Sequence, residues 1–334
     1  MTIGSASTVP TASTVPTAPS TVSTPSLASY LDKIIGQERA KKLIIKSAES
    51  SIQRSTKIPH MLFSGPPGTG KTVICLCLAD MLGLEMVQLD ASVIVNSRDL
   101  AFRLAGKPKD GVLIFIDEIH ALNSKTQETV YRLMDGEGIS YIYLRTVITI
   151  DFNPVVIGAT TNPGRLSEPL RDRIGLDIKL EPYSEPEIIK IIEQYLLDSK
   201  KINMATSMSL AIAQRSKRVP RLAKRLADRW YEWVNTQMPV EEQLTTLHEV
   251  CDLLGIDHIG LREEDRDYLY VLMQADGEPM GLRVLEQKLH AGSNTIENII
   301  EPYLSRIEFI SQTPRGRVIT EKGLVHLARW ESTH

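Results

Sequence analysis

A glycine-rich run that ends in a lysine and a threonine is the first feature of the sequence able to do chemistry. Residues 65–72 read GPPGTGKT, between a short apolar strand predicted at 61–64 and an apolar helix predicted at 73–82. Glycines let backbone N–H groups close around a phosphate chain, and the helix N-terminus adds a favourable dipole. Lys71 is then expected to contact the β- and γ-phosphates, and the Thr72 hydroxyl to ligate magnesium. The run therefore predicts a site for ATP and Mg²⁺.

Two carboxylates follow a second apolar run. Residues 113–116 read LIFI, and Asp117 and Glu118 come directly after them. Open α/β sheets bind ligands at the carboxyl ends of their strands, which is where both acids are expected to lie. Asp117 is predicted to hold the magnesium, directly or through water, and Glu118 to orient and deprotonate the attacking water. His120 lacks comparable support, and we expect it on a helix surface.

A third buried strand is followed by polar residues and then by two arginines. Residues 157–162 read IGATTN, so a polar side chain at the end of this strand can lie between the two carboxylates and sense the γ-phosphate. Arg171 and Arg173 follow. An arginine supplied across a subunit boundary stabilises charge that develops on a transferred phosphoryl group, and Arg173 is favoured over Arg171 for this role.

A basic stretch lies further along the chain. Residues 215–229 contain seven Lys or Arg. Some of these form a solvated helix face, whereas Arg221, which begins a predicted helix after Pro220, can reach back to the nucleotide phosphates.

The elements that must position these residues alternate between helices and apolar strands, which predicts a parallel α/β sheet. After about Tyr183 the strands give way to helical patterns. A third segment, about 260–330, ends in a possible two-stranded wing and so suggests a winged helix. The expected elements are a helix at 38–54, strands at 112–116 and 155–157, helices at 185–198, 205–214, 219–235, 264–274, 281–289 and 295–304, and wing strands Ile307–Ser311 and Arg317–Thr320 across the turn 313–316.

Composition sets limits on the class of protein. The chain has 334 residues, 42% hydrophobic and 24% charged, with a net charge of −3, which is ordinary for a globular protein and leaves room for a local DNA-binding patch. Three cysteines without a CxxC pair argue against a disulfide framework or a zinc site, and favour the cytoplasm. No apolar stretch is long enough to span a membrane. Residues 1–26 are almost all Ser, Thr, Pro, Ala and Val, and we expect a disordered tail there.

These motifs together resemble the RuvB family, the AAA+ motors that drive branch migration of Holliday junctions. The resemblance covers nearly all of 31–330. Its more specific motifs are SEPLRDR at 167–173, PRLA at 220–223, EPYL at 301–304 and TPRGR at 313–317.

The resemblance implies a fold and a set of site residues. The fold is an α/β AAA+ P-loop NTPase core with a parallel sheet, followed by a small helical lid and a winged-helix head; we expect the tail at 1–26, the ATPase domain at 27–183, the lid at 184–255 and the head at 256–334. Thr161 matches sensor 1, Arg173 the arginine finger and Arg221 sensor 2. The residues expected to bind the nucleotide are Gly65, Gly68, Thr69, Gly70, Lys71, Thr72, Val73, Tyr183 and Arg221.

The resemblance also implies partners, namely a hexameric ring around duplex DNA and a RuvA-type junction-binding protein. The chain departs from the family pattern at several of these places. An Arg-Pro expected near the adenine is replaced by residues 27–29, LAS. Two DNA-contacting arginines of the head fall on Ser293 and Gln312, which leaves Arg317, with Arg315 beside it. The hairpin expected at 139–153 to grip the partner is about five residues shorter at its tip, which weakens the expectation of that contact.

The leading hypothesis from the sequence is an ATP-dependent DNA motor for Holliday junction branch migration. One alternative is an ATP-switched loader or remodeller of DNA-bound protein, which uses the same core without processive movement. Another is a DNA-bound scaffold that binds ATP and hardly hydrolyses it.

Overall fold

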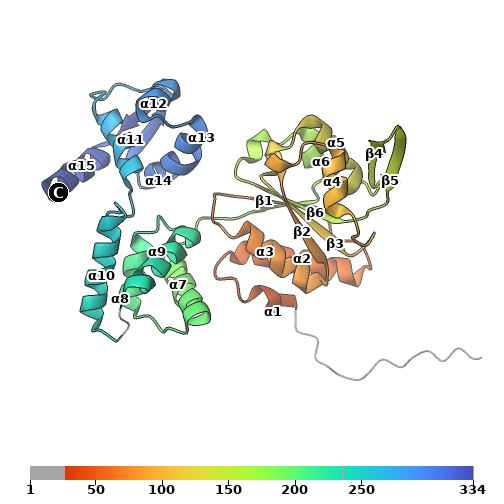
Figure 1. Ribbon diagram of the computed structural model, residues 1–334, viewed down its shortest axis with the longest axis horizontal. Helices are drawn as coiled ribbons and strands as arrows, with labels where there is room; N and C mark the ends of the chain where they lie inside the picture. The colour runs from red at the N-terminus through yellow and green to blue at the C-terminus, as the bar shows by residue number, and fades with distance from the viewer. Residues whose placement is uncertain (1–26, 235–236, 334) are drawn as a thin grey trace, which may run out of the picture.

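A computed structural model describes residues 27–234 and 237–333, which form three successive bodies. The second and third bodies lie next to each other, and the first lies on the other side of the molecule (Figure 1). The tail predicted at 1–26 lies outside the described residues. Within the described part, no helix is both long enough and apolar enough to cross a membrane.

The first body is built on a five-stranded parallel sheet with the strand order β2-β3-β6-β1-β7. The three central strands are apolar along almost their whole length and are buried on both faces, as expected where helices cover both sides of a parallel sheet. This confirms the predicted α/β fold class. The strands are β1 (Met61–Ser64), β2 (Glu85–Asp90), β3 (Val112–Asp117), β6 (Val155–Thr160) and β7 (Leu176–Lys179).

Alternating residues of the central strands belong to two different hydrophobic cores. Met61 and Phe63 of β1 pack in one core, whereas Leu62 between them packs in the other. Helices cover the two faces separately, as Figure 1 shows. The first face carries α1 (Leu27–Leu31), α2 (Glu38–Gln53) and α3 (Lys71–Leu82), and the second carries α4 (Ser97–Leu104), α5 (Ser124–Met134), α6 (Glu168–Arg173) and the short 3₁₀ turns η1 (Ala91–Val93) and η2 (Ile119–Ala121), with η3 (Pro163–Arg165) after β6.

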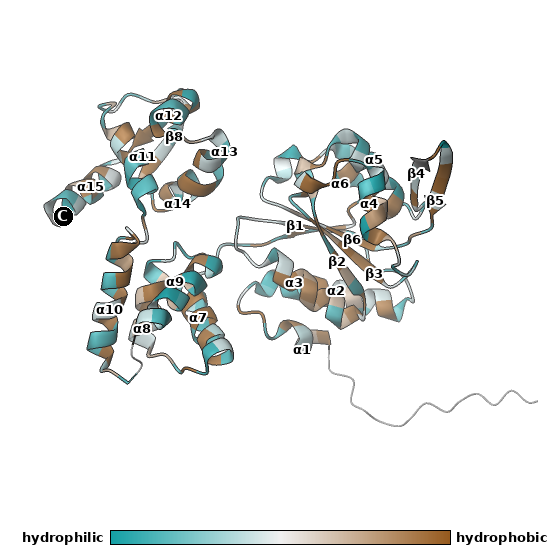
Figure 2. Cartoon of the chain, viewed as in Figure 1, coloured by the Kyte–Doolittle hydropathy of each residue, from teal (hydrophilic) through white to brown (hydrophobic). Residues whose placement is uncertain are grey.

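A two-stranded antiparallel hairpin, β4 (Ile139–Tyr143) and β5 (Thr146–Ile150), stands at the outer side of this body (Figure 1). It confirms the hairpin predicted within 139–153. Leu144 and Arg145 form its two-residue turn, and both have positive φ, as a tight hairpin turn requires. The hairpin is visibly hydrophobic in Figure 2, and Leu144 and Val147 are 81% and 66% exposed. It therefore presents apolar side chains to solvent.

The second body is a bundle of four helices around a core that includes the buried Trp230. Its helices are α7 (Glu185–Lys200), α8 (Thr206–Gln214), α9 (Pro220–Trp233) and α10 (Val240–Leu253). The first three agree with the predicted helical segments. The fourth was not among them.

The third body packs its helices and a hairpin around one core. Its elements are α11 (Glu263–Met273), α12 (Leu282–Leu289), α13 (Ser293–Thr295), the π-helical turn η4 (Ile296–Ile300), α14 (Glu301–Arg306), β8 (Ile310–Thr313), β9 (Gly316–Ile319) and α15 (Glu321–Thr333). The predicted winged helix is confirmed. The strand predicted at Ile307–Ser311 was wrong at its start, because α14 ends in a turn over residues 307–309, so the wing begins at Ile310.

Candidate active site

The phosphate loop joins β1 to α3 and is shaped by backbone that only glycine adopts readily. Gly68 and Gly70 have φ of 78° and 92°. A Cβ on Gly68 would lie 2.6 Å from Val219 of the second body, and one on Gly70 would lie 2.9 Å from the Tyr183 hydroxyl. Neighbouring segments therefore pack so closely against the loop that a side chain at either glycine would not fit.

Lys71 begins α3 and points back into this loop. Its ammonium donates to the carbonyls of Gly65 at 2.8 Å and Pro66 at 3.0 Å, and the residue is 8% exposed. Burial lowers the pKa of Lys71, while the carboxylates of Glu118 and Asp117 act in the opposite direction. An ammonium held at the centre of a closed loop, beside two carboxylates, is placed to meet an anionic phosphate chain.

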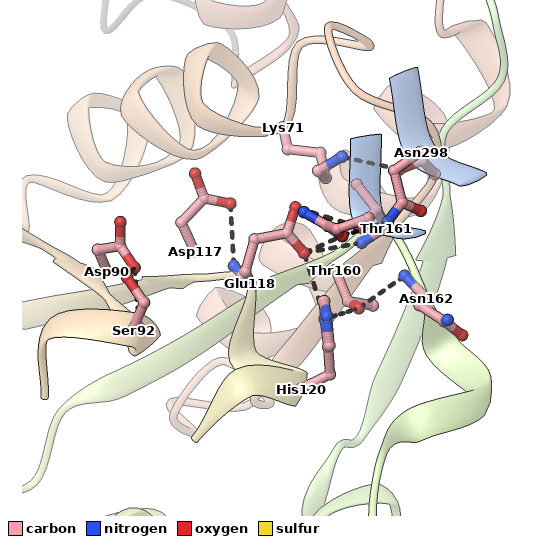
Figure 3. A network of polar contacts seen from close by, with 12 residues as sticks. Lys71, Asp90, Ser92, Asp117, Glu118, His120, Thr160, Thr161, Asn162 and Asn298 are labelled. Carbon is pink, nitrogen blue, oxygen red and sulfur yellow. Dashed lines mark hydrogen bonds and ion pairs between the residues drawn. The ribbon is translucent and has the colours of Figure 1, made fainter. Parts of the chain in front are cut away.

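Asp117 and Glu118 stand where β3 ends. Asp117 is half-buried, and burial raises its pKa; the backbone N–H of Glu118, which donates to its Oδ1 at 3.0 Å, lowers the pKa. Glu118 has a φ of 48°, so the chain turns sharply after the strand. That turn sends the two side chains in different directions, as Figure 3 shows.

Glu118 is held by residues from the end of the neighbouring strand β6. The Thr161 hydroxyl donates to its carboxylate at 3.0 Å from Oε2 and 3.2 Å from Oε1, and the Thr161 backbone N–H lies 3.2 Å from Oε2. The sequence predicts a polar side chain between the two carboxylates, and Thr161 contacts one of them, Glu118. These hydrogen bonds fix the Glu118 carboxylate at the carboxyl end of the parallel strands.

His120 joins the same network, so its prediction as a helix-surface residue was wrong. Its side chain is only 14% exposed, and Nδ1 lies 3.2 Å from Oε2 of Glu118 and 2.8 Å from the Thr160 hydroxyl (Figure 3). The 3₁₀ turn that follows Glu118 turns this ring back toward the sheet instead of out to water. The only sequence signal for it is its position two residues after the acid.

Asp90 is a second residue that sequence reasoning missed. It ends β2 and pairs in register with Asp117, and its Oδ1 accepts from the hydroxyl of Ser92 at 2.6 Å and from the Ser92 N–H at 2.8 Å. These hydrogen bonds lower the pKa of Asp90. An acidic residue at the end of an adjacent parallel strand was the available signal.

Tyr183 and Arg221 approach the loop from the second body and its connection. Tyr183 is buried, and its hydroxyl donates to the Thr69 carbonyl at 3.2 Å. Arg221 lies at the start of α9, and is exposed toward a cavity of about 730 Å³. The phosphate loop, the ends of β2, β3 and β6, and the third body share this cavity, which is lined in part by Gly68, Thr69, Glu118, Thr161, Arg221 and Asn298.

Arg173 is not among the described residues that line this cavity. It ends α6, and its guanidinium is paired with Asp135, with Nη2 2.8 Å and Nε 2.9 Å from Oδ2. The ring of Tyr131 lies beneath it, 5.0 Å from Cζ. The structure therefore holds Arg173 in a defined place at the edge of the first body, away from the site of its own chain.

The two arginines predicted to bind DNA have different surroundings in the wing. Arg315 is exposed in the β8–β9 turn. Arg317 is paired with Glu301 at 2.8 Å and with Glu297 at 3.2 Å, and its side chain is 16% exposed. Gln312 also donates to Glu301, at 2.9 Å. Arg315 is thus available to an external anion, whereas the charge of Arg317 is balanced inside the body.

The residues present suit a nucleotide with a magnesium ion. The described segments, 27–234 and 237–333, contain no group of three or more His, Cys, Asp or Glu arranged to hold a metal alone. Mg²⁺ at nucleotide sites takes one or two protein oxygens and completes its shell with phosphates and water. The Thr72 hydroxyl and the Asp117 carboxylate are hard oxygen donors of this kind, and a cation would offset the burial of Asp117.

Known proteins share this arrangement. Residues 27–180 match the family model of the Holliday junction DNA helicase RuvB P-loop domain, and residues 258–328 match that of the RuvB C-terminal winged helix domain. The Holliday junction branch migration complex subunit RuvB of Orientia tsutsugamushi (strain Boryong) is 38% identical over 315 residues, which are 90% of this chain and 93% of that protein. Its counterpart in Thermotoga maritima is 35% identical, over 89% of this chain and 90% of that protein. A solved structure of the Thermotoga maritima RuvB Holliday junction branch migration motor aligns with a TM-score of 0.77 and 32% identity, over 89% of this chain and 96% of that one.

Proposed function

The chain belongs to the RuvB family, and we propose that it is an ATP-dependent DNA motor that drives branch migration of Holliday junctions. One observation carries this proposal. Glu118, the candidate base, is fixed by Thr161 and His120 at the end of β3, in the cavity that also contains the phosphate loop. A site of this kind supports hydrolysis of ATP as well as its binding. Membership of the RuvB family indicates that this hydrolysis drives branch migration.

Each residue of the site has a role in the proposed reaction. The backbone N–H groups of Gly68, Thr69 and Gly70 and the ammonium of Lys71 bind the phosphates, and Val73 extends the contact into the first turn of α3. Thr72 and Asp117 would hold the magnesium, whose charge would offset that of the phosphate oxygens. Glu118 takes a proton from the attacking water, and Thr161 positions that carboxylate.

Arg173 serves the site of a neighbouring subunit. In its own chain it is held away from the cavity by Asp135 and Tyr131, and its side chain is 33% exposed at the edge of the body. An arginine placed this way completes a site only when another copy packs against that edge. We therefore propose a closed ring, hexameric as the resemblance implies, in a cytoplasmic setting.

We propose that the head contacts DNA and that the hairpin contacts a partner protein. Arg315, exposed at the tip of the wing, is placed to meet a DNA phosphate, and the exposed apolar side chains of Leu144 and Val147 are placed to meet a junction-binding partner of the RuvA type. The two-residue hairpin turn keeps that apolar surface small. We therefore expect the chain to bind such a partner weakly, although its ATPase site is intact.

The test is ATP hydrolysis by the full chain, alone, with duplex DNA and with four-way junction DNA. Glu118→Gln is expected to keep ATP binding and lose hydrolysis by roughly 100-fold or more. Junction DNA is expected to raise the wild-type rate. A rate that is the same with and without DNA would exclude the motor, and a rate that is unchanged by Glu118→Gln would favour a scaffold that binds ATP.

A further inference from the structure

The segment between α8 and α9 lies between the phosphate loop and the head, and it is bound to both. Val219, at its end, fills the space next to Gly68, where an added Cβ would meet the Val219 Cγ1 at 2.6 Å. Arg221 follows two residues later and faces the nucleotide cavity. Any movement of residues 215–219 therefore moves Arg221, which the sequence predicts to reach the nucleotide phosphates.

The head holds this segment through a buried ion pair. The Lys217 ammonium is paired with the carboxylate of Asp265 on α11, and the two residues are 8% and 2% exposed. The same carboxylate accepts from the N–H of Arg262, 2.8 Å away, and so also caps α11. A charge pair buried to this extent is specific in geometry, since either member left alone is an uncompensated buried charge.

A second contact from the head reaches the backbone of the same residue. Arg306 of α14 donates to the carbonyl oxygen of Lys217. Both cations also lie near the ring of Tyr303, whose centroid is 5.6 Å from the Lys217 ammonium and 5.2 Å from Cζ of Arg306. The hydroxyl of Tyr303 donates to the carbonyl of Ile259 at 2.7 Å. This bond joins the segment between α10 and α11 to the same cluster of side chains.

The segment adopts a backbone form that needs this support. Lys217 and Arg218 are consecutive non-glycine residues with φ of 53° and 58°. Such conformations are unfavourable for L residues and persist where the surroundings hold them in place. The surroundings here are the side chains of the head, so the strained form depends on a different body from the one to which the segment belongs.

We propose that Asp265 and Arg306 of the head are positioning residues for ATP turnover, because they hold residues 215–219 in the form that sets Val219 against the phosphate loop and Arg221 toward the nucleotide. The inference rests on the proposed function and on the expectation from the sequence that Arg221 contacts the nucleotide phosphates, and it goes beyond both by making the head part of the ATP site. The head, which meets DNA in the proposed function, then acts through residues 215–219 on the affinity of the same chain for nucleotide.

The test compares single and double variants of the full chain. Lys217→Met removes the charge without touching the cap of α11, and Asp265→Asn removes the charge but keeps a capping oxygen. We expect each to raise the KM for ATP, and the Kd of a fluorescent ATP analogue, by about tenfold. Combined with Arg221→Ala, each should add much less than its own single-variant loss, because both act in large part through Arg221. Lys217→Arg should restore most of the affinity.

Arg229→Met is the matched control, because Arg229 also forms an ion pair on α9, with Glu232, but exposed and within one helix. It should leave ATP affinity unchanged. If the losses of ATP affinity in Lys217→Met and Arg221→Ala add in full in the double variant, the proposal is overturned. It is also overturned if ATP affinity is unchanged while the Tm falls, because the ion pair then has a structural role alone. Nucleotide binding is measured without DNA, so failure of the DNA motor, seen as a rate indifferent to junction DNA, is a separate result.

Discussion

The hydroxyl of Thr161 lies 3.0 Å from the carboxylate of Glu118, and the Thr161 N–H donates to the same carboxylate. The two residues come from the ends of neighbouring strands, β6 and β3, which pair in parallel. The end of one strand thus sets the orientation of the acid at the end of the other. Chemistry at Glu118 should depend on Thr161 more than ATP binding does.

Thr161→Val is expected to lower kcat by about tenfold while the KM for ATP changes little. Valine keeps the β-branched shape and the N–H contact but removes the hydroxyl that fixes Glu118. Steady-state ATP hydrolysis measures this. Thr161→Ser, which keeps the hydroxyl, is the control and should retain most of the rate; an equal loss in both variants would contradict the role.

His120 is expected to contribute to the same rate. Its Nδ1 lies between Glu118 and the Thr160 hydroxyl, at 3.2 Å and 2.8 Å. His120→Ala removes this support and should lower kcat by roughly fivefold to tenfold without a matching loss of ATP affinity. His120→Asn, whose amide can take the place of Nδ1, should recover part of the rate. A loss confined to KM would instead place His120 at the bound nucleotide.

Much of the sheet and most of the site were predictable, because they rest on local patterns. Apolar runs ending in polar residues placed Lys71, Asp117 and Glu118 at one edge of the sheet, as parallel strands require. His120 was not predictable in this way, since its direction follows from the positive φ of Glu118, which no periodic pattern encodes. Asp90 was missed because its relation to Asp117 depends on which strands are neighbours.

Contacts between bodies were the least predictable part. The basic residues of 215–229 were correctly located as a group, but nothing local distinguishes Lys217, which is buried against Asp265, from Arg229, which is exposed. The balance of Arg317 by Glu301 likewise depends on how α14 packs against the wing. Sequence gives the charges, and tertiary packing decides which of them are neutralised.

Arg315 and Arg317 should therefore respond differently to substitution by alanine. Arg315→Ala removes an exposed cation, and should weaken duplex binding and reduce the slope of log affinity against log salt by about one, with the Tm unchanged. Arg317→Ala leaves Glu301, which is 2% exposed, without its cation, and should cost about 3 kcal/mol of unfolding free energy. Salt-dependent DNA binding and urea denaturation separate the two effects.

Equal changes in stability for the two variants would contradict this assignment. Tyr268 offers a further check, because its hydroxyl donates to Oε1 of Glu301 at 2.8 Å. Tyr268→Phe should destabilise the head by about 1 kcal/mol, and leave the salt dependence of DNA binding unchanged.

Acid should weaken the junction of the head with the preceding body through Asp257. This carboxylate is 3% exposed, and accepts from the N–H groups of Leu261 at 2.7 Å and Ile259 at 3.0 Å, with His326 at 2.8 Å. Burial alone would raise its pKa, but the hydrogen bond with His326 and the two N–H groups bring the pKa below its usual value.

Because the pKa of Asp257 is lower in the folded than in the unfolded chain, its contribution to stability is complete above the unfolded pKa, about 3.9, and is lost as pH falls through the folded pKa. Asp257→Asn should cost about 2 kcal/mol at pH 7 and make the fall in stability below about pH 4 less steep. Urea denaturation at pH 7 and across the acid range measures both. Parallel curves for the variant and the wild type would show that Asp257 does not titrate in this way.

Arg173 gives the most direct test of a shared active site. Its guanidinium is held by Asp135 and Tyr131 away from the cavity of its own chain, so the proposed role requires that a neighbouring subunit receive it. Arg173→Ala is expected to lower kcat by roughly 1000-fold while ATP binding by the single chain persists. Arg171→Ala is the matched control, since its guanidinium donates to the Pro163 carbonyl at 2.7 Å; it should have a much smaller effect.

Mixing variants separates action within a chain from action between chains. Arg173→Ala subunits keep Glu118, and Glu118→Gln subunits keep Arg173, so a site with both residues forms only where the two kinds of subunit meet in the right order. Random assembly at equal amounts should restore about a quarter of the wild-type sites, whereas either variant alone stays inactive. Hydrolysis that stays at the sum of the two variants at every mixing ratio would show that Arg173 serves only its own chain, or that the ring does not form.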